Sequence, residues 1–315
     1  MSTPTQRFEQ HRARLLGLAY RMLGSRADAE DILQDAWLKW SKAKVSDVRS
    51  DQAFLHTIVT RLCLDRLKGE RVKRAHYRGP WLPEPITDSD MLSAQSASEI
   101  ADDLSYGLLL ALQRLSPKER ASFLLHDVFG LSFAEVAKTL DSREATVRQS
   151  ASRARKSIRE ARPSFPVPCD AHVRLLEAFM KALNDGNPNE LKALLRDDAI
   201  YMNDSGGHRP AASRAVSGSS RIARLLIGLE RRYRPPAELI SATYATVNGS
   251  NALLVYLGAT LVQLWSVSTD DTHITAIYVV SNPEKLARLA RKPEHQPIGV
   301  VDPELDATTT GASTT

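Results

Sequence analysis

The sequence predicts a multidomain chain in which two all-α domains, the second with a helix-turn-helix, precede an α+β domain. Two observations predict the helical half: apolar residues recur at helical spacing from about residue 7 to 161, and a proline- and serine-rich segment at 79–99 divides that half in two. The third is a change of pattern after about residue 238, where short apolar runs alternate with hairpin turns. Helices followed by strands indicate the α+β class.

Length and composition narrow the class of protein. The 315 residues suit two or three domains, and no apolar run approaches the ~18–20 residues of a membrane span. The N-terminus lacks an apolar signal core, so we expect a cytoplasmic protein that binds no membrane. Cys63 and Cys169 are too few for a disulfide framework or a thiolate zinc site, so we expect two ordinary thiols, no metal and no cofactor.

Charge is unevenly distributed along the chain. The whole sequence has a net charge of +5, with +6 on residues 1–168 (27 basic, 21 acidic) and −1 on residues 169–315 (15 basic, 16 acidic). Two segments, 61–78 and 143–162, each contain seven basic and two acidic residues. Two basic patches in one half indicate a polyanion contacted at two places, although solvated helix faces would give the same counts.

The first 78 residues are expected to form three helices. The apolar residues of the first share helical spacing; they are Phe8, Leu15, Leu18 and Met22. Gly24 can end this helix, and Ser25 with Asp28 resembles a capping box for a second helix that runs to about Trp40. A third helix, from about Gln52 to Lys68, would bury Phe54, Leu55, Ile58, Val59 and Leu62.

Charged patterns mark the second and third helices. Asp28, Asp31 and Asp35 lie at i, i+3 and i+7 beside Gln34 and Leu38, and a basic partner would relieve the repulsion between these carboxylates. The third helix and its extension present a basic surface near aromatic groups, which suits melted or single-stranded nucleic acid. Its members are Arg61, Asp65, Arg66, Lys68, Arg71, Lys73, Arg74 and Arg78. Each pattern is also compatible with a solvated helix face.

A helix-turn-helix is predicted over residues 131–159. Ser132 and Glu135 form a capping box for a short helix, and a tight turn at 141–143 leads into a second one. The second helix would bury Val147, Ala151, Ala154 and Ile158. Its candidate base readers are Glu144, Thr146, Arg148 and Gln149, and its candidate phosphate contacts are Arg153, Arg155, Lys156 and Arg159. The alternative is a generic helical pair with a charged outer face.

A proline-rich linker at 163–169 precedes the third domain. Helices are expected over 173–183, from about 188, and over 219–232. Strands are expected over 238–247, 252–257, 261–267 and 273–280, with hairpin signals at 248–251 and 270–271, so we expect an antiparallel sheet. Residues 291–315 form a polar, threonine-rich tail that we expect to be disordered.

The helical half resembles the extracytoplasmic-function (group four, sigma-70 family) RNA polymerase sigma factors. Segment 28–40, DAEDILQDAWLKW, looks like their core-polymerase-binding helix. Segment 53–68, AFLHTIVTRLCLDRLK, looks like the helix that opens and reads the minus-10 element, and segment 113–158 looks like the domain that reads the minus-35 element. The resemblance implies contacts with the β′ clamp helices, the β flap and promoter DNA. It assigns clamp binding to Asp28, Asp31, Gln34, Asp35 and Leu38, and places Asp65 beside a flipped minus-10 base, between Arg61 and Arg66.

The remainder resembles the SigJ-like subfamily, which carries a C-terminal SnoaL-like domain. WLPEP at 81–85 matches its linker signature, NPEKL at 282–286 is similar to its NPDKL motif, and 203–208 partly resembles its glycine-rich DGGGK loop, with His208 or Arg209 where lysine is expected. The resemblance implies a cone-shaped domain that contacts both sigma domains and controls their activity. The implied contact residues are Trp81, Leu82, Pro83, Glu84, Pro85, Asp204, Gly206, Gly207, Asn282, Pro283, Glu284, Lys285 and Leu286.

On this basis we expect sigma region 2 at 1–78, a linker at 79–99, sigma region 4 at 100–162, a second linker at 163–169, a SnoaL-like regulatory domain at 170–290 and the tail at 291–315. The predicted protein is a non-enzymatic sigma factor, monomeric when free, that directs promoter recognition under the control of its fused domain.

Two other functions remain open. One is a helix-turn-helix transcription regulator whose third domain senses a small ligand, which binding to core polymerase without DNA would distinguish. The other is an isomerase or cyclase of the cone fold with accessory DNA-binding regions. Its candidate proton-transfer residues are Tyr201, Asp204, His208, Tyr256 and Tyr278, and no spacing shows that they converge.

Overall fold

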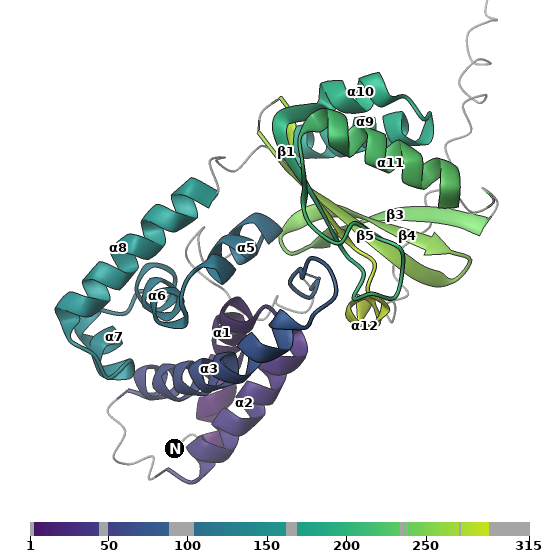
Figure 1. Cartoon of the computed structure of the whole chain (residues 1–315). Coiled ribbons are helices and arrows are strands. Elements are labelled where there is room, and N and C mark those ends of the chain that lie inside the picture. Colours follow the sequence, from purple (N-terminus) through teal and green to yellow (C-terminus); the bar gives the residue numbers. More distant parts are fainter. Residues whose placement is uncertain are drawn as a thin grey trace, which may run out of the picture.

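The computed structural model describes residues 3–43, 50–87, 104–161, 169–233, 236, 239–270 and 272–289, with the backbone alone for 70–73, 75 and 169–171. A helical part, purple to teal in Figure 1, is followed by a domain of helices on a sheet, green to yellow. This confirms the predicted fold class. Among the described helices, none has the length and apolarity needed to cross a membrane.

The first three helices are α1 (Pro4–Leu23), α2 (Arg26–Ser41) and α3 (Asp51–Ala75). Gly24 ends α1 in the left-handed conformation (φ 73°), as predicted, and Ser25 caps α2 through the Asp28 N–H. The predicted end of the third helix near Lys68 is wrong: the helix continues through Gly69 to Ala75, because a single glycine inside a helix costs only about 1 kcal/mol. Phe54, predicted to be buried, is exposed beside Trp40.

The next helices are α5 (Tyr106–Arg114), α6 (Pro117–Phe123), the π-helical turn η3 (Leu124–Val128), α7 (Phe133–Thr139) and α8 (Glu144–Ala161). Helices α7 and α8 form the predicted helix-turn-helix, with the turn at Asp141 in the left-handed conformation (φ 47°). Val147, Ala151 and Ala154 are buried and Ile158 is partly buried, as expected. One continuous apolar core joins α1, α2 and α3 to α5, α6 and α7, so the two helical units pack on each other.

The third domain comprises α9 (Cys169–Asn184), α10 (Pro188–Leu194), β1 (Leu195–Asp204), β2 (Val216–Ser217), α11 (Ser219–Tyr233), β3 (Ile240–Val247), β4 (Ser250–Leu257), β5 (Thr260–Thr269), β6 (Ile274–Val280) and α12 (Pro283–Leu286). The strand order is β2-β1-β6-β5-β4-β3, and β1 pairs in parallel with β6. The four predicted strands, β3 to β6, pair antiparallel as expected. The sheet as a whole is mixed because β1, which follows α10 without a turn signal and was not expected, pairs in parallel with β6.

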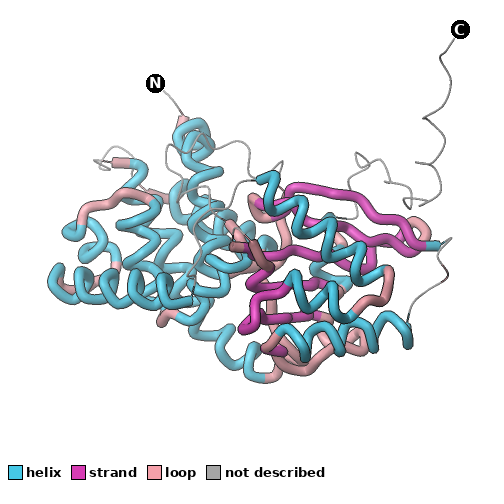
Figure 2. The backbone as a smooth tube through the Cα atoms, turned by 90° about the horizontal axis from the view of Figure 1, so that it is seen from above, coloured by secondary structure: helices cyan, strands magenta, loops and turns pink. Residues whose placement is uncertain are grey.

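The two faces of the sheet have different neighbours. One face packs under α9, α10 and α11 around Phe179, Tyr201 and Trp265. The opposite face buries Leu82 of the linker and Tyr106 of α5. Figure 2 shows the strands, in magenta, confined to this domain. The linker at 79–87 therefore passes between the sheet and the helical part. The predictions for 88–99, 163–168, the Cys169 thiol and the tail from 290 lie outside the described residues.

Candidate functional site

The acidic residues of α2 lie on an accessible surface. Asp31, Gln34, Asp35 and Leu38 are exposed, and the Leu38 side chain is 51% exposed despite being apolar. A groove of about 560 Å³ between α1 and α2 is lined by Asp31, Gln34 and Trp37 among others. This helix can accept a partner with apolar and basic groups.

The acidic residues are also tied to α3. Asp28 Oδ1 and Asp31 Oδ2 each lie 3.0 Å from Nη2 of Arg66. Two residues assigned by the family resemblance to polymerase binding thus contact one assigned to the minus-10 element.

The basic surface of α3 is partly occupied by α7, the first helix of the helix-turn-helix. Arg61 Nε donates to the Thr139 carbonyl oxygen at the end of α7 (3.2 Å), and the hydroxyls of Thr57 and Thr139 lie 3.1 Å apart. Asp65 and Lys68 form an exposed ion pair of 2.8 Å. The side chains of Arg71 and Lys73 lie outside the described residues, so the free part of this surface centres on Asp65.

Helix α8 presents most of its predicted readers to solvent. Thr146, Gln149 and Arg153 are exposed, whereas Arg148 pairs with Glu144 (2.5 Å) and lies 4.5 Å from the centre of the Phe133 ring. Three predicted phosphate contacts also have intramolecular partners: Arg155 binds Asp127 (2.7 Å), Lys156 lies 3.9 Å from Glu160, and Arg159 donates to the Arg155 carbonyl (3.4 Å).

A buried arginine joins α6 to α1. Arg120 of α6, only 4% exposed, donates to the carbonyl oxygens of Leu112 (2.8 Å) and Met22. Burial lowers its pKa to about 10, which leaves it charged at neutral pH. In the middle of α1, Arg14 donates to the Phe129 carbonyl (2.8 Å). These contacts fix the helix-turn-helix unit against the first helices.

The predicted motifs converge around Asp204, at the end of β1. Its carboxylate is completely buried and accepts hydrogen bonds from Tyr77 Oη (2.6 Å), the backbone N–H of Leu82 (2.8 Å) and that of Gly206 (3.1 Å). Lys285 Nζ lies 2.6 Å from Asp204 Oδ2 and donates to the Leu82 carbonyl (2.5 Å). One ion pair of the third domain thus binds both backbone polar groups of a single linker residue, Leu82.

The ionisation states at this junction follow from burial. Burial and the Asp204 carboxylate raise the pKa of Tyr77, so its phenol stays a donor. Burial lowers the pKa of Lys285, and the attraction to Asp204 opposes that shift. The charged Lys285 form therefore depends on Asp204.

Trp81 lies between two cations. Its ring is 4.0 Å from the Arg74 guanidinium carbon and 4.1 Å from Lys285 Nζ. A Cβ at Gly24 would lie 2.8 Å from the Trp81 ring, so only glycine fits this turn. Arg74 also donates to the Leu23 carbonyl (2.7 Å). Arg74, predicted to bind DNA, is therefore held within the junction.

Glu84 connects the linker to α2. One carboxylate oxygen accepts the backbone N–H groups of Arg26 (2.8 Å) and Ala27 (3.3 Å), at the positive end of α2. The other lies 3.5 Å from Nε of Arg288, which also pairs with Glu30 of α2 (2.9 Å). The end of the third domain therefore contacts α2 directly and through Glu84.

A second anchor was missed by sequence reasoning. Asn248, in the β3–β4 turn, exchanges hydrogen bonds with the backbone of Ile86 and donates to Tyr20 Oη (2.7 Å), which in turn donates to the Glu84 carbonyl (2.7 Å). Asn248 has a φ of 53°, which confirms that it lies in a turn. The sequence predicted this turn but gave no sign of the contacts with Ile86 and Tyr20.

The glycine-rich loop at 203–208 requires glycine at two positions. Gly206 (φ 60°) and Gly207 (φ 84°) are left-handed, and a Cβ would lie 2.6 Å from the Asn282 side chain or 2.9 Å from that of Arg78, respectively. Asn282 also donates to Tyr77 Oη (3.0 Å). The loop thus fits against the linker and the NPEKL motif.

The position of the missing loop lysine is not part of the Asp204 cluster. His208 is exposed and lies 3.9 Å from Glu284, and Arg209 is exposed. Lys285 supplies the ammonium to Asp204. The remaining motif residues Pro83, Pro85 and Leu286 are buried, whereas Pro283 is exposed.

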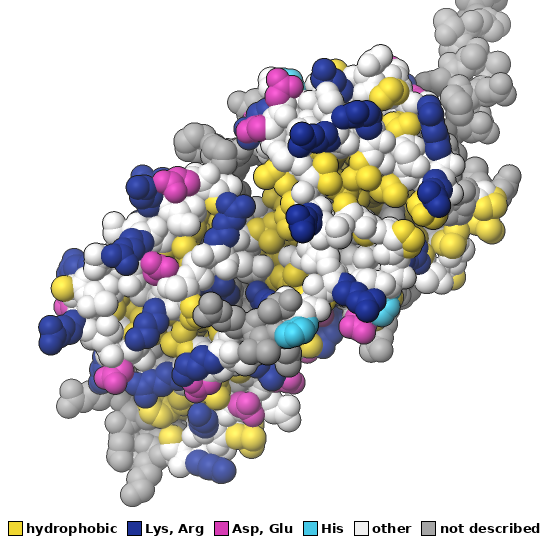
Figure 3. All heavy atoms as spheres, in the orientation of Figure 1, with side chains coloured by type: hydrophobic (Ala, Val, Ile, Leu, Met, Phe, Trp, Pro, Cys, Tyr) yellow, Lys and Arg dark blue, Asp and Glu magenta, His cyan; other side chains and the backbone are white. Residues whose placement is uncertain are grey.

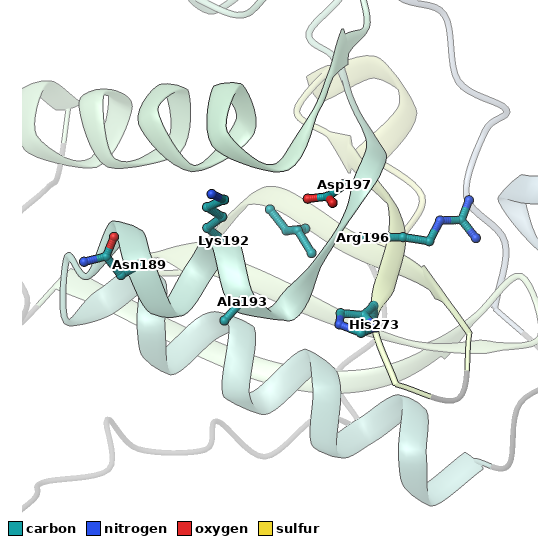
Figure 4. Close-up of a pocket in the computed structure, with 7 residues that line it drawn as sticks. Asn189, Lys192, Ala193, Arg196, Asp197 and His273 are labelled. Atoms are coloured by element: carbon teal, nitrogen blue, oxygen red, sulfur yellow. The ribbon is translucent and has the colours of Figure 1, made fainter.

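The candidate proton-transfer residues do not form one site. Tyr201 lies in the core under α9 and α11, whereas Tyr256 and Tyr278 face the other side of the sheet, where Tyr278 packs on Tyr106. A pocket of about 470 Å³ (Figure 4) lies beside α10 and β1. It is lined by Asn189, Lys192, Ala193, Leu195, Arg196, Asp197 and His273, none of them a candidate. Within the described residues, no cluster of His, Cys, Asp or Glu is suited to a metal ion.

Comparisons with known proteins give the family of the chain. Residues 7–72 match the family model "Sigma-70 region 2", and residues 107–158 match "Sigma-70, region 4". The chain is 37% identical to the ECF RNA polymerase sigma factor SigJ of Mycobacterium tuberculosis, over 88% of this chain and 91% of the relative. It is 31% identical to the probable ECF sigma factor SigI of that organism, over 88% and 92%. The crystal structure of M. tuberculosis SigJ superposes with a TM-score of 0.71 at 35% identity, covering 89% of this chain and 97% of that one.

Proposed function

The chain belongs to the extracytoplasmic-function RNA polymerase sigma factors, and on this premise we propose the roles of its parts. As a member of that family it acts with core RNA polymerase and promoter DNA in transcription initiation. We propose the domain limits given above, with Asp28, Asp31, Gln34, Asp35 and Leu38 contacting the β′ clamp helices. The exposed state of four of these five residues supports that role.

The minus-10 element is proposed to bind α3 and the minus-35 element to bind α8. On α3 the contacts centre on Asp65, with Arg61, Arg66 and Lys68 around it. On α8 the exposed Thr146, Gln149 and Arg153 support base and phosphate contacts. RNA polymerase works in the bacterial cytoplasm, so the cytoplasm is the proposed site of action.

The third domain is proposed to hold the sigma regions in an inhibited arrangement. One observation carries this proposal: the buried Asp204–Lys285 pair binds both the N–H and the carbonyl of Leu82. Because the linker between the two sigma regions is fixed at this point, the regions cannot separate freely. Charge-assisted hydrogen bonds in a buried site contribute about 1.5–3 kcal/mol each.

The inhibited arrangement also covers part of the DNA-binding surface. A promoter strand captured by α3 would compete with the Thr139 carbonyl for Arg61. Separation of region 4 from region 2 would remove Arg120 from the Met22 carbonyl. DNA binding and polymerase binding therefore have to replace intramolecular contacts.

Transcription by reconstituted holoenzyme tests this regulation. Asp204→Asn leaves the shape of the junction but removes the charge that holds Lys285, so we expect several-fold higher transcription than with the parent chain. Asp198→Asn is the matched control, because Asp198 is an exposed carboxylate on the same strand. Equal transcription by the two variants would refute regulation by the third domain. Binding to core polymerase without DNA separates this function from that of an operator-binding regulator.

We assign no catalytic role to the third domain. The carboxylate best suited to acid–base chemistry, Asp204, has its oxygens bound by Tyr77, Leu82, Gly206 and Lys285.

A further inference from the structure

Helix α11 carries a row of arginines on its outer side. Arg221, Arg224, Arg231 and Arg232 are all exposed, and their spacing of three, seven and one residues places them within about a third of the helix circumference. We call these four residues the α11 basic face. Buried apolar residues of the same helix, among them Ile222 and Leu226, fix its opposite side against the sheet.

The positive charge of this face is not neutralised within the described part of the chain. No ion pair there joins any of the four arginines to a carboxylate. Residues 209–233 contain six arginines and a single acidic residue, Glu230. Asp197 of β1 accepts a hydrogen bond from Ser219 Oγ at the start of α11 (3.3 Å). The near-neutral balance of the C-terminal half therefore conceals a concentrated patch.

A glycine lies in the middle of the row. Gly228 is exposed, has helical backbone geometry, and a Cβ added there would contact nothing within 4 Å. Glycine in a helix interior costs roughly 0.5–1 kcal/mol relative to alanine. Packing within the described part of the chain does not require this glycine, and its lack of a side chain lets a partner approach the helix backbone closely. Gly228 lies between Arg224 and Arg231, on the same side.

We propose that the α11 basic face binds the phosphate backbone of duplex DNA next to the promoter elements. Sigma factors bind promoter DNA, so the partner that they already contact is a polyanion. Arginine binds phosphate through a planar, forked guanidinium, and such contacts position a protein without reading sequence. Figure 3 shows dark blue side chains over α11 on the same side of the molecule as those over α8 and α3.

The dimensions of the face suit several phosphates. Eleven residues separate Arg221 from Arg232, which corresponds to about 16 Å along the helix. Duplex DNA carries one phosphate charge per ~1.7 Å of its axis, so a stretch of this length holds about nine phosphates on its two strands, more than the four arginines need. This contact would add to those of α8, and it goes beyond the inhibitory role proposed for the third domain.

The test measures binding of the full chain to a fluorescein-labelled 40-base-pair duplex of arbitrary sequence, by anisotropy between about 50 and 200 mM KCl. The variant is Arg224→Ala/Arg231→Ala. The matched control is Arg174→Ala/Lys181→Ala, which removes two exposed cations seven residues apart on α9 of the same domain. Alanine favours helix at all four positions, so both variants should fold, and circular dichroism checks this.

We expect the α11 variant to bind the duplex about tenfold more weakly at 50 mM KCl than the control. The slope of log K against log salt should fall by about 1.8, because two phosphate contacts are lost. Adding Gly228→Glu to the α11 double variant should weaken binding of the duplex further.

Equal affinity and slope for the two double variants would overturn the proposal. So would a loss of binding to core polymerase without DNA while duplex binding is unchanged, because the partner would then be the polymerase. The duplex-binding assay contains no polymerase, so its result does not depend on whether the third domain inhibits transcription. Likewise, the transcription assay of Asp204→Asn does not depend on whether the α11 basic face binds DNA.

Discussion

Removal of the Tyr77 hydroxyl is the cleanest way to weaken the junction. Tyr77→Phe keeps the ring beside Lys285 but deletes the hydrogen bond to Asp204 (2.6 Å) and the acceptor of the Asn282 amide (3.0 Å). Asp204 and Lys285 belong to the same domain, so their own pairing survives. The substitution therefore acts on the contact between domains and spares the fold of either one.

The size of the effect follows from the charge of the acceptor. A hydrogen bond to a carboxylate contributes about 1.5–3 kcal/mol, and the pKa of Tyr77 is raised, so the bond is intact at any pH used for transcription. Since each ~1.4 kcal/mol is a factor of ten, the ratio of open to closed molecules should rise roughly 10- to 150-fold. If the closed form is the inhibited one, transcription at limiting sigma concentration should rise with it, up to saturation.

Two assays check this prediction. Multi-round transcription with core polymerase measures activity, and small-angle scattering of the free protein measures the separation of domains. Tyr233→Phe is the control, because that ring is 51% exposed and lies on α11. Tyr77→Phe with the activity and radius of gyration of the control would refute the argument that this bond restrains the sigma regions.

Three further predictions concern other contacts. Gly24→Ala and Gly79→Ala each place alanine in a left-handed conformation, which costs about 1–2 kcal/mol. Only Gly24→Ala also inserts a Cβ into the Trp81 ring, so it should lower the free energy of unfolding in urea by about 1–3 kcal/mol more than Gly79→Ala does. Burial lowers the pKa of His56 to about 4 from 6.5. The unfolded chain binds more protons between those values, so stability should fall by about 2 kcal/mol from pH 7 to 5, and this fall should disappear in His56→Gln. Glu84→Gln should weaken the capping of α2 by about 1–2 kcal/mol and speed amide exchange in its first turn.

Each of these three predictions has a matched control variant. Gly79→Ala serves for Gly24, since a Cβ there meets nothing within 4 Å. His76→Gln, at an exposed position, should keep the pH dependence of the parent. Glu284→Gln removes an exposed carboxylate, and equal exchange rates in this variant and in Glu84→Gln would contradict the capping argument.

The elements with local signals were predictable from the sequence. Capping boxes at Ser132 and the turn at Gly24 depend on neighbouring residues, and periodicity marks the buried side of α8. Strand β1 was missed because its pairing with β6 joins segments more than 70 residues apart, and its two adjacent aspartates hide the alternation of a strand. Parallel pairing of this kind leaves no turn signal.

The junction was predictable only as a set of motifs. The resemblance selected Asp204, Lys285 and the linker, but the partners that complete the network, Tyr77 and Asn248, carry no local pattern. Their roles depend on which chain segment the fold brings opposite them. The basicity of α11 was visible in the sequence, but averaging over the C-terminal half concealed it.

We propose that the shared use of Arg66 couples polymerase binding to promoter binding. In the free protein Arg66 lies 3.0 Å from both Asp28 and Asp31, and each of these pairs is at least partly exposed. Exposed ion pairs contribute at most about 1 kcal/mol each, so this contact is easily exchanged. If basic groups of the clamp helices take the two carboxylates, Arg66 loses its partners at the moment when a promoter strand approaches α3. Because binding of the polymerase then favours binding of DNA, and linkage is reciprocal, DNA must strengthen polymerase binding by the same factor. Arg66→Ala should therefore reduce promoter binding by the holoenzyme while removing this mutual enhancement, which titration of core polymerase with and without promoter DNA measures.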